Sequence, residues 1–183
     1  MTDMLKNCQL CPRACGADRT KSRGACGAGI EIEAARASLH MWEEPPISGT
    51  NGSGPGVFSH CSLGCVFCQN RKISRREAEG QNITADALAK TFLSLEKKGA
   101  HNINLVTGAH YVPQIIEALQ IARKQGLSLP VVYNSSGYEQ VETLQLLNGH
   151  IDIYLPDYKY YSSYYAGLYS HAEDYREFAV PAI

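Results

Sequence analysis

The stretch that most constrains this chain is Cys61-Ser62-Leu63-Gly64-Cys65-Val66-Phe67-Cys68, in which three thiols follow the spacing C-x3-C-x2-C. Thiolates suit zinc, copper(I) and iron–sulfur clusters. A structural zinc site is normally closed by four protein ligands, whereas a site built for chemistry keeps one coordination position open. The motif therefore predicts a soft-metal centre with one position left for water, a substrate or a cofactor.

Two other interpretations of the motif stay open at this point. In the first, His60 or His40 completes a zinc knuckle with the three cysteines. In the second, the three thiols are simply buried as small apolar side chains. The spacing favours the open metal centre. The rest of the sequence is needed to choose among the three interpretations.

A second group of cysteines lies near the amino terminus and consists of Cys8, Cys11, Cys15 and Cys26. The segment around them has little periodic apolar patterning, so metal binding would supply the folding energy that burial does not. Four thiols with these loop lengths suit a zinc ion and an auxiliary [4Fe-4S] cluster equally well. We expect a second metal site here, and the alternative is a redox-inert loop of free thiols.

The composition is that of an ordinary globular protein. The 183 residues are 44% apolar and 19% charged, with a net charge of −1, and this length favours one domain with one core. Basic residues are scattered apart from a short run at 71–76, so neither a nucleic-acid surface nor a membrane partner is expected. No segment approaches the ~20 apolar residues that span a bilayer, and the amino terminus has no signal-peptide core. We therefore expect a cytoplasmic protein in which seven cysteines form no disulfide framework.

Beyond the cysteine motif, the chain alternates between strand and helix patterns. Strands are predicted at residues 57–59, 103–106, 130–134 and 151–155. Helices are predicted between them, at 84–99, 112–126 and 140–147, from their apolar spacing, a Thr N-cap, a first-turn Pro and terminal Gly residues. An earlier strand is predicted within 30–39. The Gly-rich run 48–56 is predicted to be a loop, and it lacks the Lys of a phosphate site.

Strands separated by single helices imply parallel pairing with right-handed crossovers. Ligand sites in such folds gather at the carboxyl ends of the strands. Here the first strand leads into the cysteine loop, and the next three lead into residues 107–110, 135–137 and 156–159. All four segments carry small or polar residues. We expect an α/β fold, a partial (β/α) barrel of parallel strands at residues 49–183, preceded by a small Cys-rich metal-binding segment at residues 1–48.

The chain resembles the radical S-adenosylmethionine (SAM) proteins, and within them the branch similar to pyruvate formate-lyase activating enzyme, including members with a Cys-rich N-terminal segment. The resemblance runs from residue 8 to residue 183. It rests on the stretches 8–15, 40–49, 61–70 (ending Cys-Gln-Asn) and 152–159. In the last of these, Asp157-Tyr158-Lys159 is similar to the Asp-Leu-Lys motif of the activating enzymes.

The resemblance implies a ligand set and a set of SAM contacts. Cys61, Cys65 and Cys68 would hold three irons of a [4Fe-4S] cluster, and SAM would chelate the fourth. The implied cofactor-binding residues are Phe67 near the adenine, Thr107 and Gly108 through their backbone, Asn134 and Ser135 as a polar pair, and Asp157 and Lys159 at the ribose and methionyl end of SAM.

The implied activity is that of an oxidoreductase. One electron from the cluster cleaves SAM reductively, and the resulting 5′-deoxyadenosyl radical takes a hydrogen from a substrate, so no catalytic residue is expected beyond the cluster and SAM. The resemblance implies a glycyl residue of a partner enzyme as substrate. Expected partners are thus a protein substrate and an electron donor such as flavodoxin or ferredoxin. The alternative is a metal-binding module without radical chemistry, either a zinc scaffold or an iron–sulfur electron carrier.

Some features depart from the family pattern or have a simpler interpretation. The family commonly has a Gly-Gly-Glu-type motif after the second strand, whereas this chain has Thr107-Gly108-Ala109-His110, without an acidic contact. His110 is interpreted either as a proton donor or as a histidine bonded to the backbone.

Glu43 and Glu44 are assigned to a solvated loop. The tyrosines between 154 and 175 are assigned to a partly buried helix and its loop, in preference to a radical relay.

The length is a further departure. Barrels of this family continue for at least two more strands, whereas this chain stops after residue 183. We expect a C-terminally truncated piece or a short variant, with an exposed sheet edge and an incomplete substrate cavity.

Overall fold

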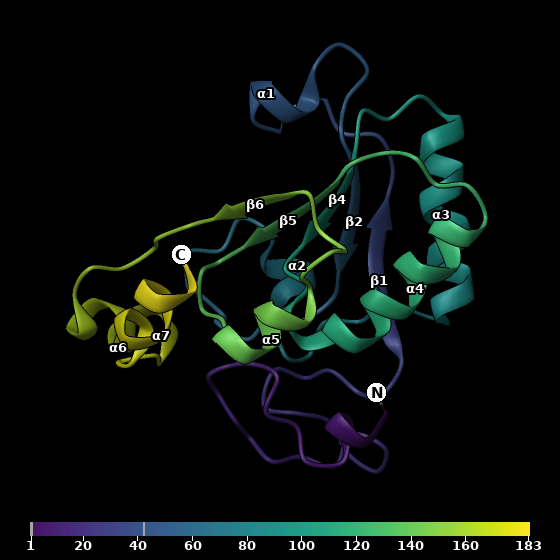
Figure 1. Cartoon of the computed structure of the whole chain (residues 1–183). Coiled ribbons are helices and arrows are strands. Elements are labelled where there is room, and N and C mark those ends of the chain that lie inside the picture. The colour runs from purple at the N-terminus through teal and green to yellow at the C-terminus, as the bar shows by residue number, and fades with distance from the viewer. Residues whose placement is uncertain (1, 42) are drawn as a thin grey trace.

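The computed structural model describes residues 2–41 and 43–183, so Trp42, part of the stretch 40–49, lies outside the described residues. A six-stranded sheet runs through the middle of the molecule, with helices packed against it and the Cys-rich segment beneath it (Figure 1). The strands are β1 (Ile32–Ala37), β2 (Gly54–Phe58), β3 (Gln81–Ile83), β4 (Ile103–Val106), β5 (Val131–Ser135) and β6 (Ile153–Pro156).

The strand order is β3-β1-β2-β4-β5-β6. The neighbouring strands β2, β4, β5 and β6 pair in parallel. Strand β1 pairs antiparallel with both β2 and β3. The sheet is open, with β3 and β6 at its two edges. The fold is therefore α/β, and its parallel part is a partial (β/α) barrel, as predicted.

The helices connect the strands and extend the fold at its carboxyl end. They are α1 (Pro45–Ser48), α2 (Arg71–Ser74), α3 (Ala85–Lys97), α4 (Val112–Lys124), α5 (Val141–Leu146), α6 (Ser163–Ser170) and α7 (Tyr175–Ala182), with short 3-10 turns η1 (Thr2–Leu5) and η2 (Ala109–Tyr111). None of the helices within residues 2–41 and 43–183 is long and apolar enough to cross a membrane.

Local sequence signals explain the two long helices. The Thr84 hydroxyl accepts a hydrogen bond from the Ala87 N–H at 3.2 Å and caps α3, which satisfies one of the free donors of the first turn. The apolar face of α3, including Phe92, is buried against the sheet and α4. Helix α4 begins with Val112 and Pro113 and also buries its apolar face. The predicted positions of both helices are confirmed.

Two sequence-based predictions need correction. The run 48–56, predicted to be a loop, contains the last residue of α1 and the first three residues of β2. A Cβ at Gly54 would come 2.8 Å from the Asn102 carbonyl oxygen, so glycine is required there for close strand packing, not for a turn. Strand β3 was not predicted, because three residues with the sequence Gln-Asn-Ile and two exposed side chains carry no strand pattern.

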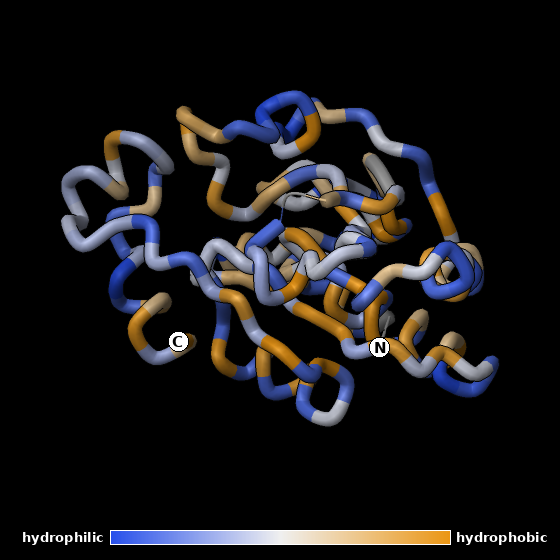
Figure 2. The backbone as a smooth tube through the Cα atoms, turned by 90° about the horizontal axis from the view of Figure 1, so that it is seen from above, coloured by the Kyte–Doolittle hydropathy of each residue, from blue (hydrophilic) through white to orange (hydrophobic). Residues whose placement is uncertain are grey.

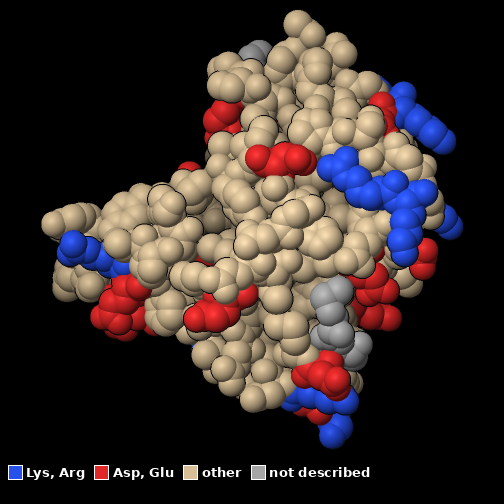
Figure 3. Space-filling view, in the orientation of Figure 1, with Lys and Arg blue, Asp and Glu red and all other residues tan. Residues whose placement is uncertain are grey.

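Hydrophobic stretches lie mainly in the centre of the molecule, and several outer loops are hydrophilic (Figure 2). The main core lies between the sheet, α3 and α4. On the face shown in Figure 3, acidic and basic side chains are interspersed, with many of the basic ones over α3 and α4. Strand β1 belongs to the Cys-rich half of the predicted division at residue 48 and yet pairs within the sheet, so that division stays a prediction.

Candidate active site

The cysteine motif occupies the loop that follows the carboxyl end of β2. Within the motif, Leu63 is only 1% exposed. It packs in a second core cluster with Tyr138, Tyr160 and Tyr175. This buried leucine therefore anchors the cysteine loop to the C-terminal helices.

The three thiols of the motif line one cavity of about 540 Å³, a volume typical of small-molecule sites. Burial raises the pKa of Cys61 to about 11, although the nearby backbone N–H groups of Gly64 and Leu63 oppose this rise. The hydroxyl of Ser74, on α2, donates to the Cys68 sulfur at 3.4 Å. Donors that would stabilise thiolates are thus already present at two of the three cysteines.

Most of the site residues expected from the sequence line this same cavity. They are Cys61, Cys65, Phe67, Cys68, Thr107, Asn134, Ser135, Asp157 and Lys159. The residues come from the carboxyl ends of β2, β4, β5 and β6, which lie side by side in the sheet (Figure 1). Because these strands are parallel, their ends meet at one edge and bring together residues that are far apart in the chain.

Among the residues expected to contact SAM, Gly108 does not line the cavity. A Cβ there would come 2.7 Å from Ile115 Cδ1, so Gly108 packs against α4. Its neighbour Thr107 does line the cavity and has a φ of 59°, which is uncommon for a β-branched residue. The Thr107 N–H donates to the Asn134 carbonyl at 2.9 Å and so joins the ends of β4 and β5. Strained backbone of this kind clusters at functional sites.

A buried tyrosine joins the ends of β5 and β6, and an ion pair lies within the segment that follows β6. Lys159 Nζ lies 2.5 Å from Asp157 Oδ2. The hydroxyl of Tyr175, on α7, accepts from the Lys159 N–H at 2.8 Å and lies 2.8 and 2.9 Å from the carbonyl oxygens of Ser136 and Asp157. Burial raises the pKa of Tyr175 to about 12, so the group stays neutral. No sequence signal distinguishes this tyrosine from its neighbours.

Two acidic residues assigned to a solvated loop also line the cavity. Glu44 is exposed and directly precedes α1, but Glu43 is half-buried. The Glu43 carboxylate lies 3.5 Å from His40 Nδ1. Burial raises the pKa of Glu43, although the nearby His40 imidazole opposes this rise. Glu43 does lie in a loop, as predicted, but its side chain is partly buried, and only the tertiary fold brings this residue to the ends of the parallel strands.

Two histidines near the cysteine loop are engaged in structural contacts. The ring nitrogens of His60 lie 3.0 Å from Glu33 Oε2 and 3.2 Å from the Arg75 carbonyl oxygen, so the ring is not free to complete a zinc knuckle. His110 is buried, and its Nε2 lies 2.8 Å from the Ser59 carbonyl oxygen, to which it donates. Burial lowers the pKa of His110 to about 3. Of its two interpretations, the histidine bonded to the backbone is confirmed.

The segment that carries Cys8, Cys11, Cys15 and Cys26 lies beneath the sheet (Figure 1). Neighbouring thiols add to the rise in two pKa values: Cys8 and Cys15 act on Cys26, and Cys26 and Cys8 act on Cys11. Burial raises the pKa of Cys11 to about 12 and also raises that of Cys26. For Cys15, backbone N–H donors outweigh burial and lower the pKa. These thiols thus influence one another without being gathered into a closed ligand set, and the metal that they would hold stays a prediction.

Within residues 2–41 and 43–183, no three His, Cys, Asp or Glu side chains are gathered closely enough to hold a metal ion. The cysteines are free of disulfide bonds. The three thiols of the motif share their cavity with polar groups from three further strand ends, and metal binding commonly completes the order of such loops. The donor chemistry therefore fits a three-thiolate iron–sulfur cluster with one open position.

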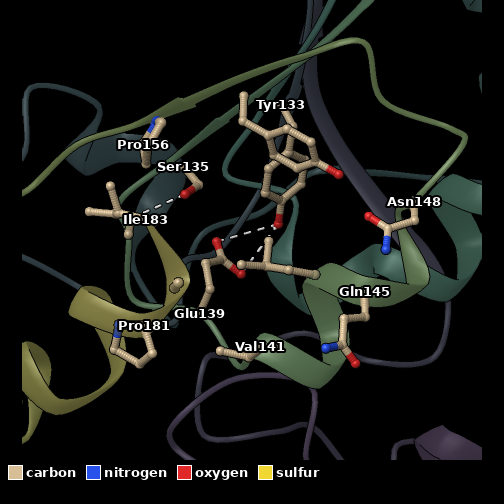
Figure 4. A pocket seen from close by; sticks show the side chains of 13 residues that line it. Tyr133, Ser135, Glu139, Val141, Gln145, Asn148, Pro156, Pro181 and Ile183 are labelled. Carbon is tan, nitrogen blue, oxygen red and sulfur yellow. Dashed lines mark hydrogen bonds between the residues drawn. The ribbon is translucent and has the colours of Figure 1, made fainter.

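A second, smaller cavity of about 280 Å³ lies between β5, β6, α5 and α7 (Figure 4). Glu139 points into it, and its two carboxyl oxygens each lie 3.4 Å from the Tyr133 hydroxyl. Burial raises the pKa of Glu139 to about 8, although hydrogen bonds with Ser135 and Tyr133 lower it. Ser135 lines both cavities, so this buried carboxyl group lies directly behind the candidate active site.

Comparisons with known proteins agree with this geometry. The family model described as Radical SAM superfamily matches residues 57–175, a range that holds the cysteine loop and all four parallel strand ends. The uncharacterized protein MJ0674 of Methanocaldococcus jannaschii is 29% identical over 163 residues, which are 86% of this chain and 47% of that protein. The chain thus spans about half the length of this curated relative. No solved structure matches the chain. Since the family model covers more than half of the sequence and includes its cysteine motif, the chain belongs to the radical SAM superfamily.

Proposed function

We propose that this chain is a radical SAM enzyme that binds a [4Fe-4S] cluster through Cys61, Cys65 and Cys68, and SAM in the adjoining cavity. Held by these three residues, the cluster and SAM would together supply one-electron reductive cleavage of SAM and a 5′-deoxyadenosyl radical able to take hydrogen from a substrate. The observation that carries the proposal is that the cysteine loop and the ends of β4, β5 and β6 line one cavity. The protein's own part is to bind, orient and shield the reactants.

The lining residues offer complementary contacts for SAM. The Lys159 ammonium suits the SAM carboxylate, and Asp157 can accept from ribose hydroxyls. Phe67 is 60% exposed and packs edge-on against Tyr160 and Tyr169, which leaves ring surface for an adenine to contact. These roles are proposed from chemistry and from the family resemblance together.

The SAM ammonium and sulfonium need an anionic neighbour, and we propose that Glu43 and Glu44 provide it. Asp157 is already paired with Lys159, and the turn after β4 carries no acidic residue. The two glutamates line the same cavity. Glu43→Gln should weaken SAM binding about tenfold, as expected for the loss of one charged hydrogen bond.

The control for this variant is Glu31→Gln, which changes an exposed glutamate outside the cavity lining. The measurement is the dissociation constant of SAM for the anaerobically reconstituted protein. Equal affinity in Glu43→Gln and the control would remove Glu43 from the site.

The resemblance to the activating enzymes also suggests a substrate and an electron donor. We propose a glycyl residue of a partner enzyme as the substrate, and an electron donor such as flavodoxin or ferredoxin, because Asp157-Tyr158-Lys159 is similar to the motif of the glycyl-radical activating enzymes. We also propose that Cys8, Cys11, Cys15 and Cys26 hold a zinc ion or an auxiliary iron–sulfur cluster. The expected result is a partner protein that co-purifies with this chain and acquires a glycyl radical once SAM and a reductant are added.

The central test is anaerobic reconstitution with iron and sulfide, followed by SAM and a strong reductant. We expect 5′-deoxyadenosine from the wild type and none from Cys68→Ser. A reconstituted cluster whose spectrum does not respond to SAM would support the electron-carrier alternative. Stoichiometric zinc, without iron or acid-labile sulfide, would support the zinc scaffold.

The two-site division has its own test. A variant with Ala at Cys61, Cys65 and Cys68 should retain the metal of the N-terminal group, measured by elemental analysis. Loss of all metal from a folded variant would show that the seven cysteines form one site.

A further inference from the structure

One arginine links the Cys-rich segment to the cysteine loop. Arg13, which lies between Cys11 and Cys15, donates from Nε to the Ser62 carbonyl at 3.0 Å and from Nη2 to the Leu63 carbonyl at 3.3 Å. The planar guanidinium presents its donors as a rigid fork. Two successive carbonyl groups of the loop are therefore held by one side chain.

The same guanidinium is anchored on its other edge. Its Nη2 donates to the Ser170 carbonyl at 2.7 Å, and its Nη1 donates to the His171 carbonyl. Its central carbon lies 5.3 Å from the ring centroid of Tyr138. Ser170 and His171 end α6, where carbonyl groups lack helical partners and a cation is favourable. Arg13 is thus fixed between the end of α6 and the cysteine loop.

The position of Arg13 also depends on the turn that carries it. Ala14 has a φ of 37°, which is uncommon for a residue other than glycine. Its N–H donates to the Cys11 carbonyl at 2.9 Å. Such conformations persist where the surrounding structure determines them. The Cys-rich segment therefore sets where the guanidinium lies.

The two carbonyls that Arg13 binds belong to peptide units whose other ends face a cysteine. In a trans peptide, the C=O of one residue and the N–H of the next point in opposite directions. The Ser62 carbonyl thus orients the Leu63 N–H, and the Leu63 carbonyl orients the Gly64 N–H. These are the two N–H groups that oppose the rise in the pKa of Cys61, as donors close to its sulfur do.

We propose that Arg13 is a positioning residue, which aims the Leu63 and Gly64 N–H groups at the Cys61 sulfur and so raises the reduction potential of a cluster held there. Hydrogen bonds to cluster sulfurs tune the potential because they stabilise the charge added on reduction. The statement on the potential rests on the proposed function. Arg13 itself lies outside the residues 57–175 that match the family model.

The experiment compares Arg13→Gln with Arg123→Gln. Arg123 also donates to a backbone carbonyl, that of Leu127 at 2.9 Å, but it lies at the end of α4, away from the cysteine loop. The first readout is amide hydrogen exchange at Leu63 and Gly64 in the metal-free protein. The second is the midpoint potential of the reconstituted cluster, followed by electron paramagnetic resonance.

Arg13→Gln should exchange both amides about tenfold faster than the wild type, as expected for a local loss of order, and should shift the potential to more negative values. Arg123→Gln should leave both readouts unchanged. Unchanged exchange in a folded Arg13→Gln protein overturns the proposal. Faster exchange with an unchanged potential overturns the part that concerns the potential.

A third variant keeps the test decisive if Arg13→Gln does not fold. Arg13→Lys retains the charge but loses the planar fork, so it should also give faster exchange and a lower potential. Wild-type values for this variant overturn the proposal. A wild-type chain that takes up no cluster refutes the proposed function, whereas the exchange comparison still decides whether Arg13 orients the two peptide units.

Discussion

Replacing Glu139 by Gln should remove a large pH dependence of the stability of this protein. Glu139 is 2% exposed, and burial raises its pKa to about 8 from an ordinary value of 4.5. Because the folded pKa lies above the unfolded one, the folded state retains a proton that the unfolded chain has lost. The stability from this group is fully present below about pH 4.5 and is lost as the pH rises through about 8.

The magnitude follows from the two pKa values. At about 1.4 kcal/mol for each pH unit, the interval from 4.5 to about 8 gives an upper bound of ~5 kcal/mol. Hydrogen bonds that Ser135 and Tyr133 give to the ionised group are already part of this pKa. Relaxation of the cavity around the charge reduces the effect, so we expect ~2–4 kcal/mol. For a chain of this size, that corresponds to roughly 5–15 °C in the melting temperature.

The assay is thermal unfolding under anaerobic conditions between pH 5 and pH 9 for the wild type, Glu139→Gln and Glu142→Gln. Glu142 lies on the exposed side of α5, so its variant controls for the loss of one acidic group. The wild type and the control should lose stability together as the pH rises, whereas Glu139→Gln should lose less. Parallel curves for all three proteins would refute the raised pKa and the burial that causes it.

Three further predictions concern a helix cap and the strand ends. Thr84→Ala should lower the unfolding free energy by about 1 kcal/mol, measured by denaturant unfolding, because the Ala87 N–H loses its acceptor. Tyr175→Phe should cost about 1–3 kcal/mol and weaken SAM binding, because the Lys159 N–H and two carbonyls lose a buried partner. Asp157→Asn should reduce SAM affinity by about tenfold while the melting temperature changes little, since its ion pair with Lys159 is partly exposed.

Matched controls and contrary results complete these three tests. Thr50→Ala is the control for Thr84→Ala, and Tyr164→Phe is the control for Tyr175→Phe, because both make the same chemical change at an exposed position. Asp86→Asn, on α3, is the control for Asp157→Asn. Stability in Thr84→Ala equal to that of Thr50→Ala would argue against the cap. Tyr175→Phe with wild-type stability would show that its hydroxyl holds no strand ends. Unchanged SAM affinity in Asp157→Asn would place SAM elsewhere.

Local sequence patterns were sufficient to locate a helix or strand that is stabilised mostly by its own residues. Helices α3 and α4 and strand β4 could be located because a cap, a first-turn proline and apolar spacing act within a few residues. The amino-terminal part of β2 could not, because its glycines are typical of a turn, whereas Gly54 is needed for close contact with the neighbouring Asn102 backbone. Likewise, the short polar strand β3 is determined by pairing with β1, and not by its own sequence.

The sequence by itself determined the chemistry of the site. The spacing of Cys61, Cys65 and Cys68, and the alternation of strands and helices after them, are local properties, and they predicted a thiolate centre at the carboxyl ends of parallel strands. The tertiary structure alone decided which distant groups support that centre. Glu43, Tyr175 and Arg13 reach the cavity or its loop through contacts between segments far apart in the chain. Such contacts depend on how the sheet, helices and Cys-rich segment pack together, and packing leaves no periodic signal in a single sequence.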